Sequence, residues 1–389
     1  MQRQAESAES CHAGSAHLTA PGRGRGSCRG IPAMSASQKV VIAGAGIIGA
    51  VAAFVLSRAG AHVTIVEARP GPGEGVSAAS FGWINAITFD PENDPALYGL
   101  RRDAFGAWAA LEQALGKPLP GHRQGALFWG RSVEETMETR DRHREAGSSY
   151  RLIGQAEIAA LLPQLTSPPE AALFAPEEFA LDVSATVRML LKAAEENGAV
   201  LITGAPVTGI DSEGGHVSAV RAGDHRLEAD RLIVAAGTES GRILAPFVPD
   251  LGVAASPAAL VTVTGNFPQT TCITDSPELE FRIPAPGLLM SAHSVPEGSN
   301  PEDALARRTV ERVKRVLKET GEVAVRSVQI GQRPFPESGV PLVGPVASLA
   351  GAYAAVAHPG VILAPAIGAT LHDLIAGRPA GSGLQPKAV

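Results

Sequence analysis

One stretch near the start of the chain limits the fold more than any other, and it reads VVIAGAGIIGAVAAFVLSRAGAHVTIVEA at residues 40–68. Its β-branched opening predicts a buried strand that runs directly into Gly44, Gly46 and Gly49. In a strand–turn–helix unit the first such glycine allows a sharp turn. The second lets the backbone approach a pyrophosphate, and the third lets the helix pack closely on the strand. We expect the helix to end near Gly60, with an anion-binding site formed by the amides at its start.

A second strand, HVTIVE, ends at Glu67, the position at which this motif places an acid for the ribose hydroxyls. An acidic residue here disfavours a cofactor with a 2′-phosphate. The order of strand, helix, strand and acid indicates a bound dinucleotide, and the alternative is an ordinary α/β core turn that is rich in glycine. The loop at residues 68–86 carries Ser77 and Ser80, which we expect to donate to phosphate or ribityl oxygens. A plain surface loop is the other interpretation.

Two later segments also end a strand at a place suited to a ligand. DRLIVAAG predicts a buried strand that ends in Ala236 and Gly237, and a glycine at the rim of a parallel sheet lets the backbone approach a ligand. YAAVAHPGVILAP predicts a strand that passes through His358 into a helix beginning near Gly360. We expect this second helix start to face the cofactor, where its dipole suits a group that becomes negative during reaction.

The remaining periodic segments supply the framework. Residues 97–115 predict an amphipathic helix whose aromatic side chains belong to the core. Ser184 is expected to cap a helix that ends at Gly198, and a further helix is expected to begin at Asn300–Pro301 and end at Gly321. Further strands are predicted at about 200–203 and 206–210, followed by a polar hairpin region to about residue 229. Within residues 251–330, ALVTVTG and GLLMSAHS are also predicted to be strands.

Composition excludes several classes of protein. The 389 residues, 45% hydrophobic and 19% charged, are typical of a globular chain long enough for two domains. The net charge of −6 argues against a nucleic-acid partner. The most apolar segment, GVILAPAIGATLHDLIAG, is interrupted by Pro365 and His372, so no integral membrane segment is expected. Cys11, Cys28 and Cys272 lack metal-ligand spacing, so we expect no metal centre, no disulfide framework and a cytoplasmic location.

Residues 1–38 differ from the rest, because they are rich in Ser, Gly, Ala and Arg and carry no periodic apolar pattern. We expect a disordered extension without the apolar region of a secretory signal. Met34 lies just before SASQKVVIAGAGIIG, where a domain of this kind normally begins. One hypothesis is therefore that the first 33 residues reflect a start codon assigned too early, which mass spectrometry of natively expressed protein would test.

In this order, the segments resemble the family of FAD-dependent D-amino-acid oxidases and dehydrogenases, which includes glycine and sarcosine oxidases. The resemblance covers roughly residues 39–380 and rests on GAGIIG with Glu67, the strand near Val207, DRLIVAAG, GQRPFPESGVPLVGP and AHPGVILAPAIG. It implies an α/β fold with a Rossmann-like FAD-binding domain and an inserted, mainly antiparallel-sheet α+β substrate domain. The implied FAD-binding domain comprises residues 39–90, 180–250 and 335–389, and the substrate domain comprises residues 91–179 and 251–334.

The resemblance also implies a bound, non-covalent FAD. The glycine turn and Glu67 would hold its ADP half, Val207 would meet the adenine end through its backbone, and His358 would lie near the pyrimidine edge of the flavin. The full set of expected cofactor-binding residues is Gly44, Gly46, Ile47, Ile48, Gly49, Glu67, Ala68, Ser77, Ser80, Val207, Ala236, Gly237, His358, Gly360 and Val361.

Arg333 matches the arginine that grips the substrate carboxylate in similar amino-acid oxidases. A guanidinium offers two parallel donors to a carboxylate, although an arginine before a proline is more often part of a surface ion pair. His358 and Asn85 complete the expected catalytic set. Trp83 belongs to the same SFGWINA segment and either reaches the active site or packs in the core. His293 is a weaker candidate, for which a structural role is favoured.

The implied reaction oxidises the C–N bond of a small amino acid or secondary amine by hydride transfer to flavin N5, giving an imine that hydrolyses. The electron acceptor is O2 or another carrier. Cysteine is absent near Arg333, which disfavours the covalent flavin of sarcosine oxidases, and Leu289 aligns with their lysine over the flavin, which leaves a dehydrogenase open. Two alternatives stand beside this function. GAGIIG and Glu67 alone permit an NAD-dependent dehydrogenase, and a flavin-binding protein without turnover fits the same motifs.

Overall fold

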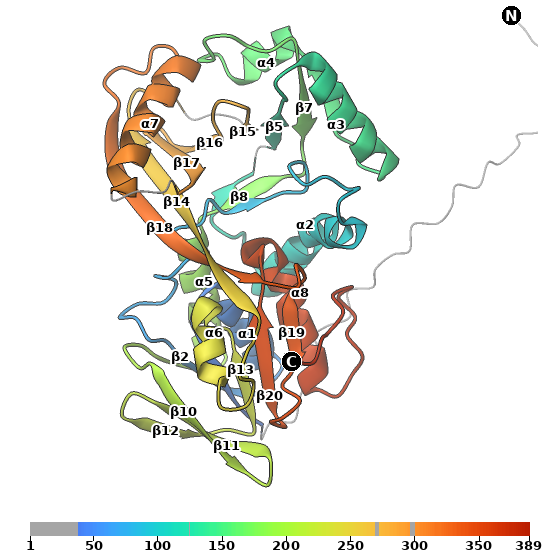
Figure 1. Ribbon diagram of the computed structural model, residues 1–389, viewed down its shortest axis with the longest axis vertical. Coiled ribbons are helices and arrows are strands. Elements are labelled where there is room, and N and C mark those ends of the chain that lie inside the picture. Colours follow the sequence, from blue (N-terminus) through green and yellow to red (C-terminus); the bar gives the residue numbers. More distant parts are fainter. Residues whose placement is uncertain (1–37, 124, 269–271, 296–299) are drawn as a thin grey trace, which may run out of the picture. The chain divides into compact units, whose positions relative to one another are not determined.

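The strand predicted at the start of the glycine-rich stretch lies inside a six-stranded sheet in the computed structural model, and Figure 1 labels the sheet's strands β2, β13, β19 and β20. The structure describes residues 38–389 apart from 124, 269–271 and 296–299, so the expectations for the amino-terminal extension, Cys11, Cys28 and Met34 lie outside the described residues. The sheet order is β19-β20-β13-β1-β2-β9. Its strands are β1 (Lys39–Ala43), β2 (His62–Val66), β9 (Val200–Ile202), β13 (Arg231–Val234), β19 (Leu342–Pro345) and β20 (Ala352–Val356).

Five of these strands are parallel, and only the edge strand β19 runs antiparallel to its neighbour β20. Parallel strands end at one edge of the sheet, and in open α/β folds ligands bind outside that carboxyl edge. Gly44 follows β1, Glu67 follows β2, Ala236 follows β13 and His358 follows β20 within a few residues. The fold therefore brings the four segments singled out in the sequence to the same edge.

Helices around this sheet pack through small and aromatic residues. α1 (Ile47–Arg58) contacts α5 (Val183–Glu196) and α8 (Gly360–Ile375), and α8 contacts α2 (Pro95–Leu115). A Cβ at Gly368 would lie only 2.7 Å from Val51, so this glycine permits the close approach of α8 to α1. The fully buried Trp108 of α2 donates from Nε1 to the carbonyl of Ile362, 3.2 Å away.

A second, larger sheet carries the order β18-β14-β17-β16-β15-β5-β7-β6 and is mainly antiparallel. Its strands are β5 (Ala126–Phe128), β6 (Arg151–Gly154), β7 (Ala171–Ala175), β14 (Val253–Thr264), β15 (Ile273–Asp275), β16 (Phe281–Ala285), β17 (Leu288–Ser294) and β18 (Ala324–Pro336). The two longest strands, β14 and β18, pair along their whole length (Figure 1). Both contact the short 3-10 helix η1 (Gly237–Glu239), which directly follows Ala236 at the carboxyl edge of the first sheet.

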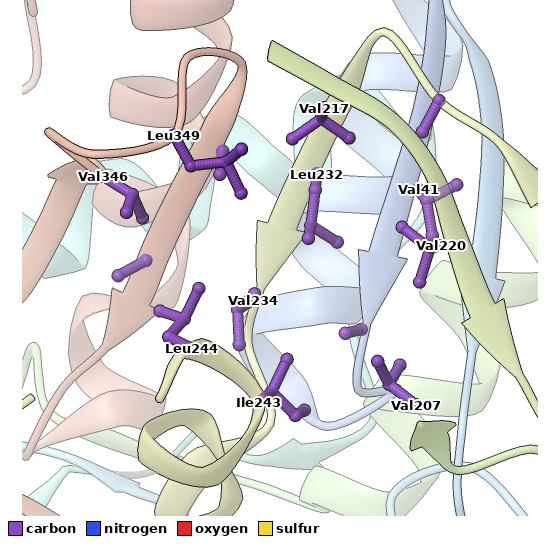
Figure 2. Close-up of a cluster of buried hydrophobic side chains, with 14 of the residues drawn as sticks. Val41, Val207, Val217, Val220, Leu232, Val234, Ile243, Leu244, Val346 and Leu349 are labelled. Carbon is purple, nitrogen blue, oxygen red and sulfur yellow. The ribbon is translucent and has the colours of Figure 1, made fainter. Parts of the chain in front are cut away.

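Two small sheets complete the strand framework. One is β10 (Val207–Glu213), β11 (His216–Ala222) and β12 (His225–Glu228), and the other is β3 (Trp83–Ile84), β8 (Phe179–Leu181) and β4 (Gly121–His122). Apolar side chains of β10 and β11 meet those of β1 and β13 in a buried cluster, as Figure 2 shows for Val207, Val220, Val41 and Leu232. The remaining helices are α3 (Val133–Glu145), α4 (Gln155–Leu161), α6 (Ser240–Leu244) and α7 (Pro301–Val316).

The fold class expected from the sequence is confirmed, with an α/β sheet and a mainly antiparallel one. The division into two domains at the boundaries given above stays a prediction. Within the described residues no helix combines the length and the apolar character that a membrane crossing needs.

Two helix ends differ from the sequence prediction. Asp182 caps α5, since its carboxylate accepts from the Ala185 amide at 2.9 Å, and Ser184 already lies inside the helix. α7 begins after Asn300 as expected but ends at Val316, before Gly321. Leu317 is in extended conformation there and bridges to Leu165, so tertiary pairing ends the helix rather than glycine.

Replacing Trp108 with alanine should lower the free energy of unfolding by about 3–5 kcal/mol, because it empties a fully buried site and removes the hydrogen bond to Ile362. Gly106→Ala in the same helix is the control. No atom lies within 4 Å of its added Cβ, and we expect a gain of about 0.5–1 kcal/mol. Urea denaturation of both variants measures this. A Trp108→Ala protein as stable as the wild type would contradict the packing.

Candidate cofactor and substrate site

The glycine turn after β1 has the geometry that the sequence motif requires. Gly44 has φ of 107°, in the left-handed region, and a Cβ there would lie 2.5 Å from the carbonyl oxygen of Ala235. A Cβ on Gly49 would overlap the carbonyl oxygen of Gly44. Gly46 is less crowded, since its nearest neighbour would be the Ser77 hydroxyl at 3.3 Å. The turn and the helix contact thus need glycine at Gly44 and Gly49, while Gly46 leaves space beside the start of α1.

The start of α1 carries no capping side chain on Gly46, and the amide of Ile47 donates to the Ser77 hydroxyl at 3.2 Å. Ser77 is buried, so the loop after β2 delivers a hydroxyl directly to this helix start. Ser80 behaves differently, because its hydroxyl accepts from the amide of Gly82, two residues further along its own loop. The structure therefore joins Ser77, but not Ser80, to the anion-binding end of α1.

Glu67 lies beside the same turn. One carboxylate oxygen accepts from the amide of Ala45 at 2.8 Å, and the other accepts from the amide of Arg69 at 2.9 Å. These two bonds hold a partly buried carboxylate at the end of β2, where ribose hydroxyls of a dinucleotide can donate to it. The next residue, Ala68, is exposed.

The start of α8 lies against the start of α1, because a Cβ on Gly360 would be 3.5 Å from the side chain of Ile48. α8 has Pro359 as its N-cap residue and no side-chain cap, and Val361 follows within its first turn. Two adjacent helix starts whose N-cap residues provide no capping side chain favour negative groups at this edge. The glycine cradle, Glu67 and the paired helix starts thus fit a dinucleotide such as FAD.

Three further expected residues lie just after β13 and at the start of β10. Ala236 and Gly237 lead into η1, and Gly237 has φ of 60°. The side chain of Val207 is buried in the cluster of Figure 2, which leaves only its backbone for an adenine contact. Its carbonyl accepts from Arg242 at 3.5 Å.

A cationic group approaches this edge from the other sheet. Arg333 of β18 donates from Nη2 to the Ser256 hydroxyl at 2.9 Å and from Nε to the Ser256 carbonyl at 3.4 Å. Its Cζ lies 5.2 Å from the ring centre of Phe335, and that ring lies 4.0 Å from the ring of His358. Among the described residues no ion pair involves Arg333, and burial lowers its pKa without discharging it.

His358 is neutral at physiological pH. Its burial, followed by the charges of Arg333 and Arg101, lowers its pKa to about 4. The imidazole therefore adds no third positive charge beside the two arginines. It lies two residues before the start of α8, and its ring packs on the ring of Phe335 with an angle of 33° between the two planes.

Asn85 joins this group through Arg101 of α2. Its side-chain oxygen accepts from Arg101 Nη1 at 2.9 Å and from the Thr88 hydroxyl at 3.2 Å. The guanidinium of Arg101 also lies over the ring of Phe89 at 4.6 Å. Burial lowers the pKa of Arg101 to about 10, an effect that Glu178 partly offsets.

A buried carboxyl binds the backbone of the loop that carries Asn85. Glu178 is 1% exposed, and its Oε1 accepts from the amides of Ala86 and Ile87 at 2.8 Å and from the Tyr150 hydroxyl at 3.2 Å. Burial raises its pKa to about 8 despite these bonds. Sequence reasoning missed Glu178, Phe335 and the role of Arg101. The available signal was a charged residue, Arg101, within the apolar stripe of residues 97–115.

Three other candidates lie elsewhere. Trp83 is buried with Phe81 in the core, which favours the packing interpretation. His293 bonds to the Thr309 hydroxyl of α7 at 2.9 Å, which favours the structural role. Leu289 is buried in the core against α7, and alternation along β17 places it on the face opposite Arg333, which disfavours its expected position over the flavin. Met290 lies on the Arg333 face instead.

Comparisons with known proteins agree with this geometry. A sequence model of the family described as FAD dependent oxidoreductase matches residues 39–374. The chain is 27% identical over 374 residues to the uncharacterized oxidoreductase YurR of Bacillus subtilis, covering 90% of this chain and 98% of that protein. It is 26% identical over 359 residues to the glycine oxidase of Pseudomonas aeruginosa, covering 88% and 96%. The crystal structure of glycine oxidase from Geobacillus kaustophilus has a similar fold, with a TM-score of 0.78, 21% identity and coverage of 89% and 96%.

Gly49→Ala should abolish or strongly reduce the flavin content of the purified protein, because its Cβ overlaps the Gly44 carbonyl and displaces the turn from the start of α1. The ratio of visible to ultraviolet absorbance measures the loss. Gly99→Ala, also a glycine within a helix but with no atom near its added Cβ, should keep the wild-type ratio. A Gly49→Ala protein with full flavin content would show that the turn does not hold the cofactor.

Proposed function

Because the chain belongs to the family of FAD-dependent oxidoreductases, we propose that it oxidises the C–N bond of a small amino acid or secondary amine. Its cofactor is FAD, which replaces the NAD-dependent alternative. The product of such a reaction is an imine, which water hydrolyses to a carbonyl compound and an amine or ammonia. The name of the relative from Pseudomonas aeruginosa, glycine oxidase, supports an amino-acid substrate.

The observation that carries this proposal is the position of Arg333. It projects from β18 beside Phe335 and His358, and in the described part of the chain no carboxylate pairs with it. Arg333 is only partly buried and lacks a carboxylate partner among the described residues, so a substrate carboxylate can pair with its guanidinium in bidentate geometry. Ser256, opposite Arg333 on β14, fixes the guanidinium through its hydroxyl.

The chain's own residues prepare the substrate in three ways. Arg333 binds and orients the carboxylate, which holds the neighbouring C–N bond in one direction. The positive charges of Arg333 and Arg101 lower the pKa of a nearby substrate ammonium, so the amine sheds its proton to solvent and reacts in the neutral form. Neutral His358 and the free amides at the start of α8 offer donors to developing negative charge. The bound FAD supplies the ring that accepts two electrons.

The finer features of the function stay predictions. Cys272 is the only cysteine among the described residues, and it is fully buried in the core against α7. Because no described cysteine is available for a thioether link, this supports non-covalent attachment of FAD. O2 or another carrier takes the electrons, and Met290 rather than a lysine lies on the Arg333 face of β17. The cytoplasmic location rests on the cysteine usage alone.

Anaerobic addition of a pool of D- and L-amino acids and N-methyl amines should bleach the visible flavin band of the purified protein. Bleaching follows from two-electron reduction by a substrate, and dividing the pool identifies that substrate. Readmission of O2, compared with an added dye acceptor, then distinguishes an oxidase from a dehydrogenase. A flavin band that no member of the pool changes would favour the non-catalytic flavin protein.

Arg333→Gln should raise KM for the identified carboxylate substrate by about 10- to 100-fold, the loss expected for charge-assisted hydrogen bonds. We expect a smaller fall in kcat, since the same bonds also orient the substrate. Arg326→Gln is the matched control, because Arg326 is an exposed arginine on the same strand. Steady-state kinetics of both variants, with flavin content checked, test the assignment. An unchanged KM in Arg333→Gln would refute the carboxylate role.

A further inference from the structure

We propose that the substrate carries two acidic groups, as an amino acid or amine with a second carboxylate does, and that Arg101 binds the second one while Arg333 binds the first. This inference rests on the proposed function, because it names the substrate class of the same site. Arg101 would then determine specificity.

The packing of α2 against α8 directs Arg101 toward the candidate site. Trp108 of α2 bonds to the carbonyl of Ile362, which lies in the first turn of α8. Arg101 precedes Trp108 by two helical turns and therefore lies on the same face of α2. The charge of Arg101 acts on His358, which lies two residues before the start of α8, and lowers its pKa. Arg101 and Arg333 thus both act on one imidazole from different elements.

The guanidinium of Arg101 has unused donor capacity. Nη1 donates to the side chain and, at 3.4 Å, to the carbonyl of Asn85, whereas the buried Nε has no hydrogen-bond partner among the described residues. Within that part of the chain, the ion pairs of other arginines lie elsewhere, and none includes Arg101 or Arg333. Two cations beside one neutral histidine leave an excess positive charge that a dianionic ligand would balance.

Glu178 does not supply this balance. When ionised, Glu178 acts on Arg101 through its charge, yet no ion pair forms between them, and Oε2 has no hydrogen-bond partner in the described structure. Its Oε1 is engaged by two backbone amides and Tyr150. Burial keeps the carboxyl largely protonated at neutral pH. Glu178, the acid that acts on Arg101, is therefore largely neutral near pH 7 and does not balance its charge.

Arg282, which is more deeply buried than Arg101 or Arg333, shows the contrast. Arg282 is 3% exposed and lies over the ring of Phe81, but Asp182 acts on it as a nearby negative charge, and its charge acts on His122 rather than on His358. Arg282 therefore belongs to a separate structural cluster. Among the described residues, Arg333 and Arg101 are the cations whose charges lower the pKa of His358, and we propose that they bind the two ends of one small molecule.

The competing role for Arg101 is purely structural, as a clamp on the Asn85 loop. The first experiment measures binding of unreactive acids to the holoenzyme by perturbation of the flavin spectrum and by calorimetry. Malonate, succinate and glutarate are compared with acetate, propionate and butyrate. We expect the dicarboxylates to bind at least about tenfold more tightly. Equal affinity of the two series in the wild-type holoenzyme would overturn the proposal, whatever the variants do.

The second experiment uses Arg101→Gln, Arg101→Lys and, as the matched control, Arg102→Gln. Arg102 is adjacent on α2 but donates to Ala146 and Ser148, away from His358. Arg101→Gln should lose the dicarboxylate preference and keep monocarboxylate binding, Arg101→Lys should restore part of the preference, and Arg102→Gln should retain all of it. A preference that survives Arg101→Gln with full flavin content would show that Arg101 is only a clamp.

Turnover separates this inference from the proposed function. With both enantiomers, the kcat/KM for aspartate and glutamate should exceed that for asparagine and glutamine, which differ only in one carboxylate. If asparagine or glutamine reduces the flavin as fast as aspartate or glutamate does, the substrate needs no second carboxylate and the inference is refuted. The proposed amine-oxidising function would still hold in that case. Tight dicarboxylate binding without reduction by any amine would instead support Arg101 and refute the proposed function.

Discussion

The close contact between Gly49 and the carbonyl of Gly44 determines how the rest of the site is built. It brings α1 down onto β1, so the amides at the start of the helix lie at the carboxyl edge of the parallel sheet. Glu67, η1 and the start of α8 reach the same edge because their strands run parallel to β1. One backbone contact therefore sets the position of a cofactor-binding edge that four separate segments of the sequence share.

The substrate side is organised by charge rather than by backbone geometry. Two paired strands, β14 and β18, carry Arg333 from the antiparallel sheet to the edge of the parallel one, whereas Arg101 belongs to α2. The ring of Phe335 contacts the ring of His358, which adds no charge. The charges of both arginines act on His358, and the anionic substrate that we propose would balance them.

Local sequence was sufficient for the parallel sheet, because glycine spacing and β-branched runs act within about thirty residues, and it placed β1, α1, β2 and the start of α8 correctly. It was insufficient where partners are distant in the chain. Glu178 meets Ala86 and Tyr150 only through tertiary packing. Leu289 and Met290 lie on opposite faces of β17, so an alignment error of one residue is enough to assign the wrong one to the Arg333 face. The resemblance to amino-acid oxidases identified Arg333, whereas Arg101 needed the packing of α2 on α8.

The proton held by Glu178 links folding to acidity. In an unfolded chain a glutamate loses its proton near pH 4.3, roughly, but the buried carboxyl keeps it until a pH of about 8. Between these values the folded state binds more protons than the unfolded one. The contribution of this residue to stability is therefore fully present below the lower pKa, and it declines as the pH rises through the interval. The loop that presents Asn85 is thus held by a group that stabilises the fold more at mildly acidic pH than at alkaline pH.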